Sequence, residues 1–221
     1  MNDNRMTMND NSVTTESNDA KQMTKSDNRM TTKLIIAGVG GQGVVYITTI
    51  LADAAVLAGI PVATSEIHGL SQRGGSVNSG ITFGENTFGF VEDGGADFLL
   101  GLEILEAFRC LNYLNKNSKA VIDDMKMIPH SVNTQNATYP DVNTYLDFMR
   151  SNISEVDFVS GNIDVSDSIL RNIYVLGRAS RMKGFPVKAE YISAVLKKNA
   201  KTGWEEKIIS VFNNAVNSEN Q

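Results

Sequence analysis

The chain has 221 residues, a net charge of −5 at pH 7, 42% hydrophobic residues and 20% charged residues. This length and composition are typical of one globular domain with a substantial core, and the acidic balance argues against nucleic-acid binding. No apolar run approaches the roughly 20 residues of a membrane-spanning helix, and no apolar signal segment begins the chain, so we expect a cytoplasmic protein.

The N-terminal residues 1–32 differ from the rest of the chain. They are rich in Asn, Thr, Ser, Asp and Met, and the run Asp-Asn-Arg-Met-Thr at 3–7 recurs at 27–31. Such a segment buries too little apolar surface to offset its ordering entropy. We therefore predict a disordered tail over 1–32 and a folded domain over 33–221.

The folded part opens with a strand, a turn, a helix and a second strand. An apolar strand is predicted over Leu34–Ala37, followed by a glycine-rich turn and a helix over Gln42–Ala58 with apolar residues at helical spacing. Gly59 ends this helix, and Pro61–Ser65 reads as the second strand. We expect the two strands to form a parallel, right-handed β-α-β unit.

The middle of the chain alternates between strand and helix patterns. Two short β-rich pieces, Gly80–Phe83 and Phe88–Val91, flank a hairpin-like turn at Glu85-Asn86. The elements predicted after them are a strand at Ala96–Leu100, a helix at Glu103–Leu114, a strand at Ala120–Ile122, a short helix near Tyr145–Arg150 and a strand near Asp157–Val159.

The last third is helical. Asp167 is a suitable cap for a helix that reaches about Met182, and two further helices are predicted over 188–199 and 203–216. Together the elements predict an α/β fold: a Rossmann-like three-layer domain with a mostly parallel sheet and C-terminal helices.

The glycine-rich turn is the first candidate site. Gly38, Gly40 and Gly43 have the G-x-G-x-x-G spacing, which presents backbone N–H groups and a helix N-terminus to a phosphate in dinucleotide-binding proteins. Glu66, after the second strand, has a tolerable spacing for binding a ribose. Alternatively, the glycines only permit a tight turn with close helix–sheet packing, and the pattern alone leaves both interpretations open.

A second candidate is the polar run 65–76 at the end of the second strand, where open parallel sheets bind ligands. Arg73 beside Gly74 and Gly75 suits an anion or an interface, although it could instead pair with a local carboxylate. His68 is predicted to have a structural or hydrogen-bonding role, because two separated histidines do not make a metal site.

Two further residues complete the list of candidates. Glu103 begins a helix after the Ala96–Leu100 strand, which places it at the same sheet edge as Arg73, although acids in a first helical turn are usually solvated. Cys110 is the one cysteine. A [4Fe–4S] cluster usually takes four thiolates, so the chain cannot hold one alone, and we predict a small buried hydrophobic residue.

Taken in order, these runs resemble one family. Gly38–Gly43, the run 66–76, the run 94–109, Tyr139-Pro140 and Arg171–Gly177 are similar to the gamma-type domain of 2-oxoacid:ferredoxin oxidoreductases, with most similarity to its indolepyruvate branch. The resemblance covers about 33–215 and identifies 33–221 as a pyruvate/ketoisovalerate oxidoreductase gamma-type catalytic domain. The family usually has Asn where Asp123 or Asp124 stands.

The resemblance implies a subunit of an enzyme that decarboxylates a 2-oxoacid, transfers the acyl group to coenzyme A and passes electrons to ferredoxin. Thiamine diphosphate, Mg²⁺ and the [4Fe–4S] clusters are then expected in a large partner subunit, with none bound by this chain, which would be inactive alone. The resemblance predicts that one set of residues faces the partner or a ligand: Gly38, Gly40, Gly41, Gln42, Gly43, Glu66, His68, Gln72, Arg73, Gly74, Gly75 and Glu103. An NAD(P)-binding dehydrogenase and a non-catalytic nucleotide-sensing module are the alternatives.

Overall fold

A computed structural model of the chain describes residues 31–68, 75–127, 139–161 and 167–218, without the side chains of Ile67 and His68. One six-stranded sheet has the order β2-β3-β1-β4-β5-β6. The strands are β1 (Thr31–Val39), β2 (Val62–His68), β3 (Ser76–Gly84), β4 (Ala96–Gly101), β5 (Leu114–Asp123) and β6 (Glu155–Val159). The helices are α1 (Val44–Leu57), α2 (Ile104–Arg109), the 3₁₀ turn η2 (Leu111–Tyr113), α4 (Val142–Asn152), α5 (Ser168–Ser180), α6 (Ala189–Asn199) and α7 (Glu205–Asn217).

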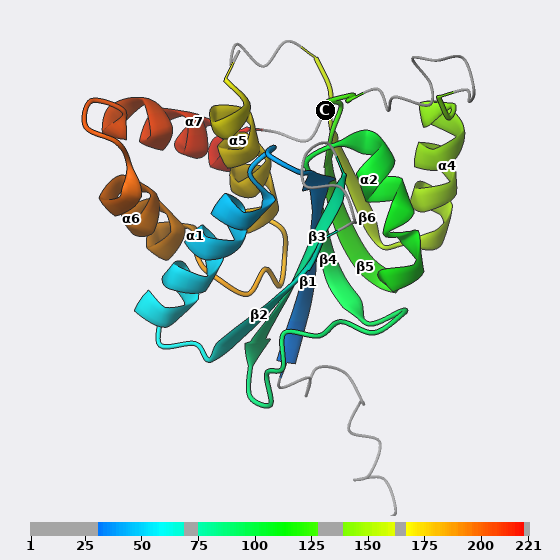
Figure 1. The fold of residues 1–221 in the computed structure, drawn as a ribbon, viewed down its shortest axis with the longest axis horizontal. Helices are drawn as coiled ribbons and strands as arrows, with labels where there is room; N and C mark the ends of the chain where they lie inside the picture. Colours follow the sequence, from blue (N-terminus) through cyan, green and yellow to red (C-terminus); the bar gives the residue numbers. More distant parts are fainter. Residues whose placement is uncertain (1–30, 69–74, 128–138, 162–166, 219–221) are drawn as a thin grey trace, which may run out of the picture.

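The helices cover both faces of the sheet and make three layers (Figure 1). Helices α1 and α5 pack on one face, with α6 and α7 packed against them, and α2 and α4 pack on the other face. Along β1, Leu34 and Ile36 point to the first layer and Ile35 and Ala37 to the second. Because successive side chains of a strand alternate between faces, this continuous apolar run is buried on both sides. The predicted three-layer α/β fold with C-terminal helices is confirmed.

The first β-α-β unit is interrupted in the sheet. Strands β1 and β2 run in the same direction, as predicted, but β3 lies between them and pairs antiparallel with both. Residues Ser76–Gly84 form one long strand, of which the sequence pattern had indicated residues 80–83 alone. The remaining neighbours, β1–β4, β4–β5 and β5–β6, are parallel.

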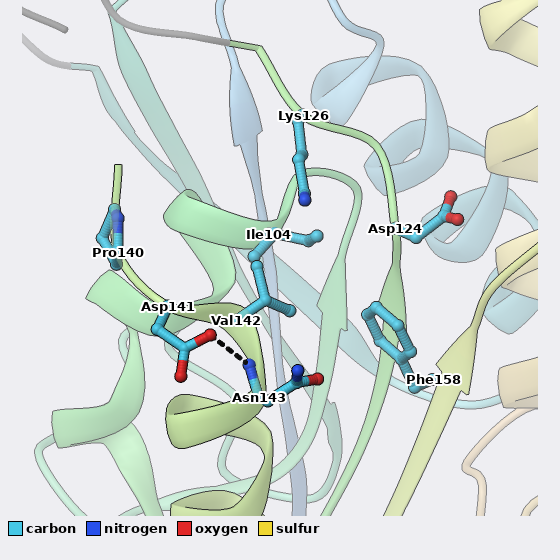
Figure 2. A pocket seen from close by; sticks show the side chains of 8 residues that line it. All are labelled: Ile104, Asp124, Lys126, Pro140, Asp141, Val142, Asn143 and Phe158. Carbon is cyan, nitrogen blue, oxygen red and sulfur yellow. Dashed lines mark hydrogen bonds between the residues drawn. The ribbon is translucent and has the colours of Figure 1, made fainter. Parts of the chain in front are cut away.

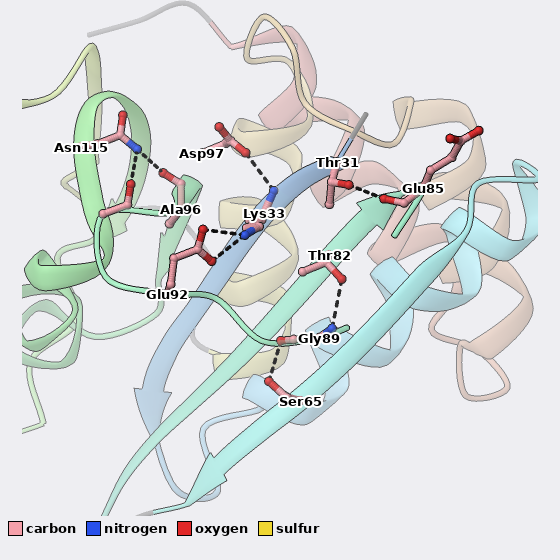
Figure 3. Close-up of polar contacts among 11 residues, drawn as sticks. Thr31, Lys33, Ser65, Thr82, Glu85, Gly89, Glu92, Ala96, Asp97 and Asn115 are labelled. Carbon is pink, nitrogen blue, oxygen red and sulfur yellow. Dashed lines mark hydrogen bonds and ion pairs between the residues drawn. The ribbon is translucent and has the colours of Figure 1, made fainter. Parts of the chain in front are cut away.

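The predicted hairpin between Gly80–Phe83 and Phe88–Val91 is wrong. Asn86 does turn the chain, with φ at 58°, but the second piece forms no strand. It crosses the sheet face instead, where Ser65 Oγ donates to the Gly89 carbonyl at 2.7 Å and Gly89 N donates to Thr82 Oγ1 at 3.1 Å (Figure 3). A strand at this place would need ladder partners, whereas side-chain hydroxyls satisfy the backbone of Gly89 here.

The predicted Glu103–Leu114 helix is shorter than expected. Helix α2 ends at Arg109, a 3₁₀ turn follows, and β5 begins at Leu114. Asn115 favours this exit, because its side-chain amide donates to the carbonyls of Gly94 and Ala96 beside the new strand. Asparagine competes for backbone partners in this way and is therefore a poor residue for helix interiors.

The C-terminal helices follow the prediction closely. Asp167 caps α5, with its carboxylate accepting from Ile169 N at 2.8 Å. Helices α5 and α7 approach closely at Gly177, where an added Cβ would lie 2.6 Å from the Ala215 Cβ. None of the helices in the described part of the chain is long and apolar enough to cross a membrane.

Candidate functional site

The glycine loop Gly40–Gly43 joins β1 to α1 in a conformation that requires glycine. Gly41 and Gly43 have φ values of 89° and 109°, a region that residues with a Cβ rarely adopt. At Gly38 an added Cβ would lie 2.8 Å from a Val44 methyl carbon. The glycines therefore serve a tight turn and close packing of α1 on the sheet, the structural alternative left open by the sequence.

Several polar groups of the loop are already bound within the chain. Gly40 N donates to the Gly75 carbonyl at 2.8 Å. The buried Gln42 side chain accepts from Val39 N at 2.9 Å and donates to the Leu102 carbonyl. Asn172 of α5 donates to the Gln42 carbonyl at 2.7 Å. The loop is thus a junction between β1, Gly75, the start of α2 and α5.

The structure brings most of the described candidate residues to one edge of the sheet. Gly38 pairs with Val77, which pairs in turn with His68, so these three strands reach the edge side by side. Gly75 contacts the glycine loop there, and Glu103 follows the adjacent strand β4. Glu66 lies on the edge strand β2, opposite Ser79. Gln72, Arg73 and Gly74 lie outside the described residues.

Glu103 has a different environment from the solvated helix start that its sequence suggested. It is fully buried and accepts three hydrogen bonds, from Glu106 N at 2.8 Å, Met127 N at 3.0 Å and Tyr139 Oη at 3.1 Å. Burial, with the Glu103 charge second, raises the pKa of Tyr139, so the phenol remains a donor. One carboxylate thereby holds the start of α2 and two distant segments together.

A partly buried ionic cluster at the end of β5 was missed by sequence reasoning. Arg171 of α5 binds both carboxylate oxygens of Asp123, at 2.7 and 2.9 Å from Nε, and also contacts Asp124. The hydrogen bonds with Asp123 raise the pKa of Arg171, so the guanidinium stays charged. The signal available in the sequence was a charged and an amide residue, Arg171 and Asn172, early in an amphipathic helix.

Cys110 is buried beside α2, as predicted, and is poorly suited to metal binding. It is 0% exposed, and burial, together with the nearby Glu106 charge, raises the pKa of its thiol to about 12. The thiolate is the form that binds iron or zinc. Over the described ranges, no group of three or more His, Cys, Asp or Glu side chains could hold a metal ion. The donor set therefore does not fit an iron–sulfur cluster.

Because the chain has one cysteine, its thiol reactivity can be measured cleanly. At pH 8 a thiol with a pKa of about 12 is ionised on the order of one part in 10⁴. We expect an aromatic disulfide reagent to leave the native chain unmodified and to titrate one thiol per chain in strong denaturant. Rapid stoichiometric reaction of the native chain would contradict this burial.

Comparisons with known proteins agree on one family. The family model for pyruvate ferredoxin/flavodoxin oxidoreductase matches residues 33–218. The chain is 32% identical over 181 residues to an indolepyruvate oxidoreductase subunit IorB from Archaeoglobus fulgidus, covering 78% of this chain and 88% of that protein. It is 34% identical over 174 residues to the IorB subunit from Thermococcus kodakarensis, covering 74% and 84%.

A solved structure shares the fold. The gamma subunit of a keto/oxoacid ferredoxin oxidoreductase from Geobacter sulfurreducens superimposes with a TM-score of 0.60 at 20% identity, over 83% of this chain and 95% of that chain. The family match spans the described sheet from Lys33 onward and all its helices. The chain belongs to the pyruvate ferredoxin/flavodoxin oxidoreductase family.

Proposed function

We propose that this chain is the small subunit of a 2-oxoacid:ferredoxin oxidoreductase that acts on an aryl pyruvate such as indolepyruvate. The observation that carries the proposal is the match, over most of both chains, to proteins named indolepyruvate oxidoreductase subunit IorB. In the reaction, a 2-oxoacid and coenzyme A give an acyl-CoA, CO₂ and a proton, and the two electrons released reduce two one-electron ferredoxins. The enzyme is an oxidoreductase, and this chain is one of its subunits.

The cofactors of this reaction belong to the partner in our proposal. Thiamine diphosphate with Mg²⁺ supplies the decarboxylation chemistry, and [4Fe–4S] clusters carry the electrons, both in a large subunit. The buried thiol of Cys110 supports this division, since the chain offers no exposed thiolate to a cluster. The chain alone is then inactive.

The C-terminal edge of the sheet is the part of this chain that faces the partner in our proposal. Gly38–Gly43, Gly75 and Glu103 meet there, tied by the Gly40–Gly75 and Gln42–Leu102 hydrogen bonds. Such an edge is where open α/β sheets bind ligands. The edge is internally hydrogen-bonded, which suits a surface that shapes the entrance for substrate or coenzyme A in another subunit.

Reconstitution tests this function. Coexpressed with a large subunit that carries thiamine and cluster motifs, the chain is expected to copurify with it, and the complex to reduce ferredoxin when given indolepyruvate and coenzyme A. The chain alone is expected to give no reduction, and omission of coenzyme A from the complex serves as the control. Equal turnover by the large subunit without this chain would contradict the proposal.

The nicotinamide alternative has its own measurement. Calorimetric titration of the isolated chain with NAD(H) and NADP(H) is expected to show no micromolar binding. A phosphate cradle would offer the backbone N–H groups of Gly40 and Gln42. These two groups already donate hydrogen bonds to the Gly75 and Val39 carbonyls, respectively. Micromolar binding of either nucleotide would favour a dehydrogenase or a nucleotide sensor instead.

A further inference from the structure

An open pocket of about 550 Å³ lies beside the sheet edge, at the ends of β5 and β6 and the starts of α2 and α4 (Figure 2). Its apolar lining comes from Ile104, Val142, Pro140 and Phe158. This volume falls within the usual range for small-molecule sites, which combine an apolar lining with a few polar groups. The pocket is large enough for one aromatic ring with a short side chain.

The walls of the pocket are held by the buried carboxylate described above. Glu103 accepts from Met127 N, the neighbour of the lining residue Lys126, and from Tyr139 Oη, the neighbour of Pro140. The Lys126 ammonium also lies 5.9 Å from the centre of the Tyr139 ring. The two segments that bring polar groups to the pocket are therefore fixed to each other, and a ligand would meet a largely formed site.

Among the charged residues that line the pocket, the two carboxylates are bound within the chain, and the Lys126 ammonium is available to a ligand. Asp124 is bound by Arg171, and its other oxygen accepts from Gly161 N at 3.2 Å. Asp141 caps α4, accepting from Thr144 N at 3.1 Å. Lys126, by contrast, has no carboxylate within ion-pair distance among the described residues. Figure 2 shows its side chain reaching down toward Ile104, whereas the Asp124 carboxylate points away from the centre.

We propose that this pocket binds a small organic carboxylate with an apolar body. The carboxylate lies at the Lys126 ammonium, and the apolar body covers Phe158, Ile104 and Val142. An ammonium supplies charged N–H donors, from which a carboxylate accepts its stronger hydrogen bonds. The site uses residues of this chain alone, so it stands independently of the proposed catalytic partner.

The ligand class is tested by a matched set of probes on the full chain, followed by amide chemical shifts in NMR. Phenylacetate has the charge and the ring, phenylacetamide lacks the charge, and acetate lacks the ring. We expect phenylacetate to bind with a Kd on the order of millimolar, as small ligands with one charged contact do, and to shift the amides of Val142 and Asn143. The other two are expected to bind about tenfold more weakly or not at all.

Phenylpyruvate, added as a fourth probe, distinguishes a 2-oxoacid ligand from a simple aryl carboxylate. Tighter binding than phenylacetate would identify a 2-oxoacid ligand, and equal binding would identify recognition of the carboxylate and ring alone. Either result supports the pocket. Absence of localised shifts at about 20 mM phenylacetate, well above the roughly millimolar Kd expected, would overturn the proposal.

Variants at Lys126 test the role of the ammonium. Because Lys126 is exposed, Lys126→Glu is expected to keep the thermal midpoint and to weaken phenylacetate about tenfold or more, while Lys126→Arg stays within about threefold. Lys207 on α7 provides a matched control, since its ammonium lies 5.4 Å from the ring of Trp204, the N-cap residue of that helix. Lys207→Glu is expected to leave binding unchanged. Equal weakening by both charge reversals would indicate general electrostatics and contradict the site.

Discussion

Replacing Arg178 by methionine is expected to lower the free energy of unfolding by about 3–5 kcal/mol, because it leaves a buried carboxylate without its cationic partner. Arg178 of α5 binds both oxygens of Asp157 on β6, at 2.7 Å from Nε and 2.6 Å from Nη2. The two side chains are 6% and 7% exposed. The guanidinium also donates to Ser218 Oγ at 2.7 Å, so one residue links α5, the edge strand and the end of α7.

The double variant Arg178→Met/Asp157→Leu is the control for this effect. A buried ion pair replaced by apolar residues of similar size often costs little, because both desolvation penalties disappear together. Urea unfolding of the full chain should therefore show the double variant to be more stable than Arg178→Met alone. If the two are equally destabilised, packing around Arg178 rather than the uncompensated charge is responsible, and our explanation is wrong.

The second large effect is expected at Gln42 in the glycine loop. Gln42→Leu keeps the approximate volume but leaves the buried Val39 N–H and Leu102 carbonyl without their partner. Each orphaned group costs about 1–3 kcal/mol, so the free energy of unfolding should fall by about 2–6 kcal/mol. Because Leu102 precedes Glu103, we also expect weaker assembly with the partner subunit in copurification.

Thr49→Ala on the exposed face of α1 is the matched control. Thr49 makes a side-chain hydrogen bond to the Val45 carbonyl, a local contact with no link to another element. Its loss should change the free energy of unfolding by no more than about 0.5 kcal/mol. A comparably small change in Gln42→Leu would show that water replaces both lost hydrogen bonds and that the loop is not the junction described above.

Sequence reasoning succeeded where one local rule decides the outcome. The run Ala96–Leu100, which is apolar on both faces from Phe98 onward, became β4, buried in the middle of the sheet. Asp167 became the cap of α5 because an Asx residue before an amphipathic run has a clear local role. The strand, glycine turn and helix at residues 34–58 were predictable for the same reason.

Sequence reasoning failed where segments distant in the chain determine the strand pairing or the burial of a side chain. No local pattern shows that Ser76–Gly84 inserts between β1 and β2, since the hydrogen-bond partners are chosen by the whole sheet. The burial of Glu103 depends on Met127 and Tyr139, which approach it only in the folded chain. The roles of Arg171 and Arg178 also depend on distant segments. A cation in a helix is usually solvated, whereas each of these two pairs with a carboxylate on a strand of the sheet.

The central position of β1 has a consequence for synthesis on the ribosome. The first strand of the fold to emerge has β3 on one side and β4 on the other, with partners as distant in the chain as Leu34 and Phe98. Its apolar run therefore has no hydrogen-bonded neighbour on one side until β3 has left the exit tunnel, and none on the other side until β4 has followed. Long-range strand pairing is slow and leaves strand edges exposed while it is incomplete. During this time we expect the nascent chain to be prone to aggregation, and binding of a chaperone would reduce that exposure.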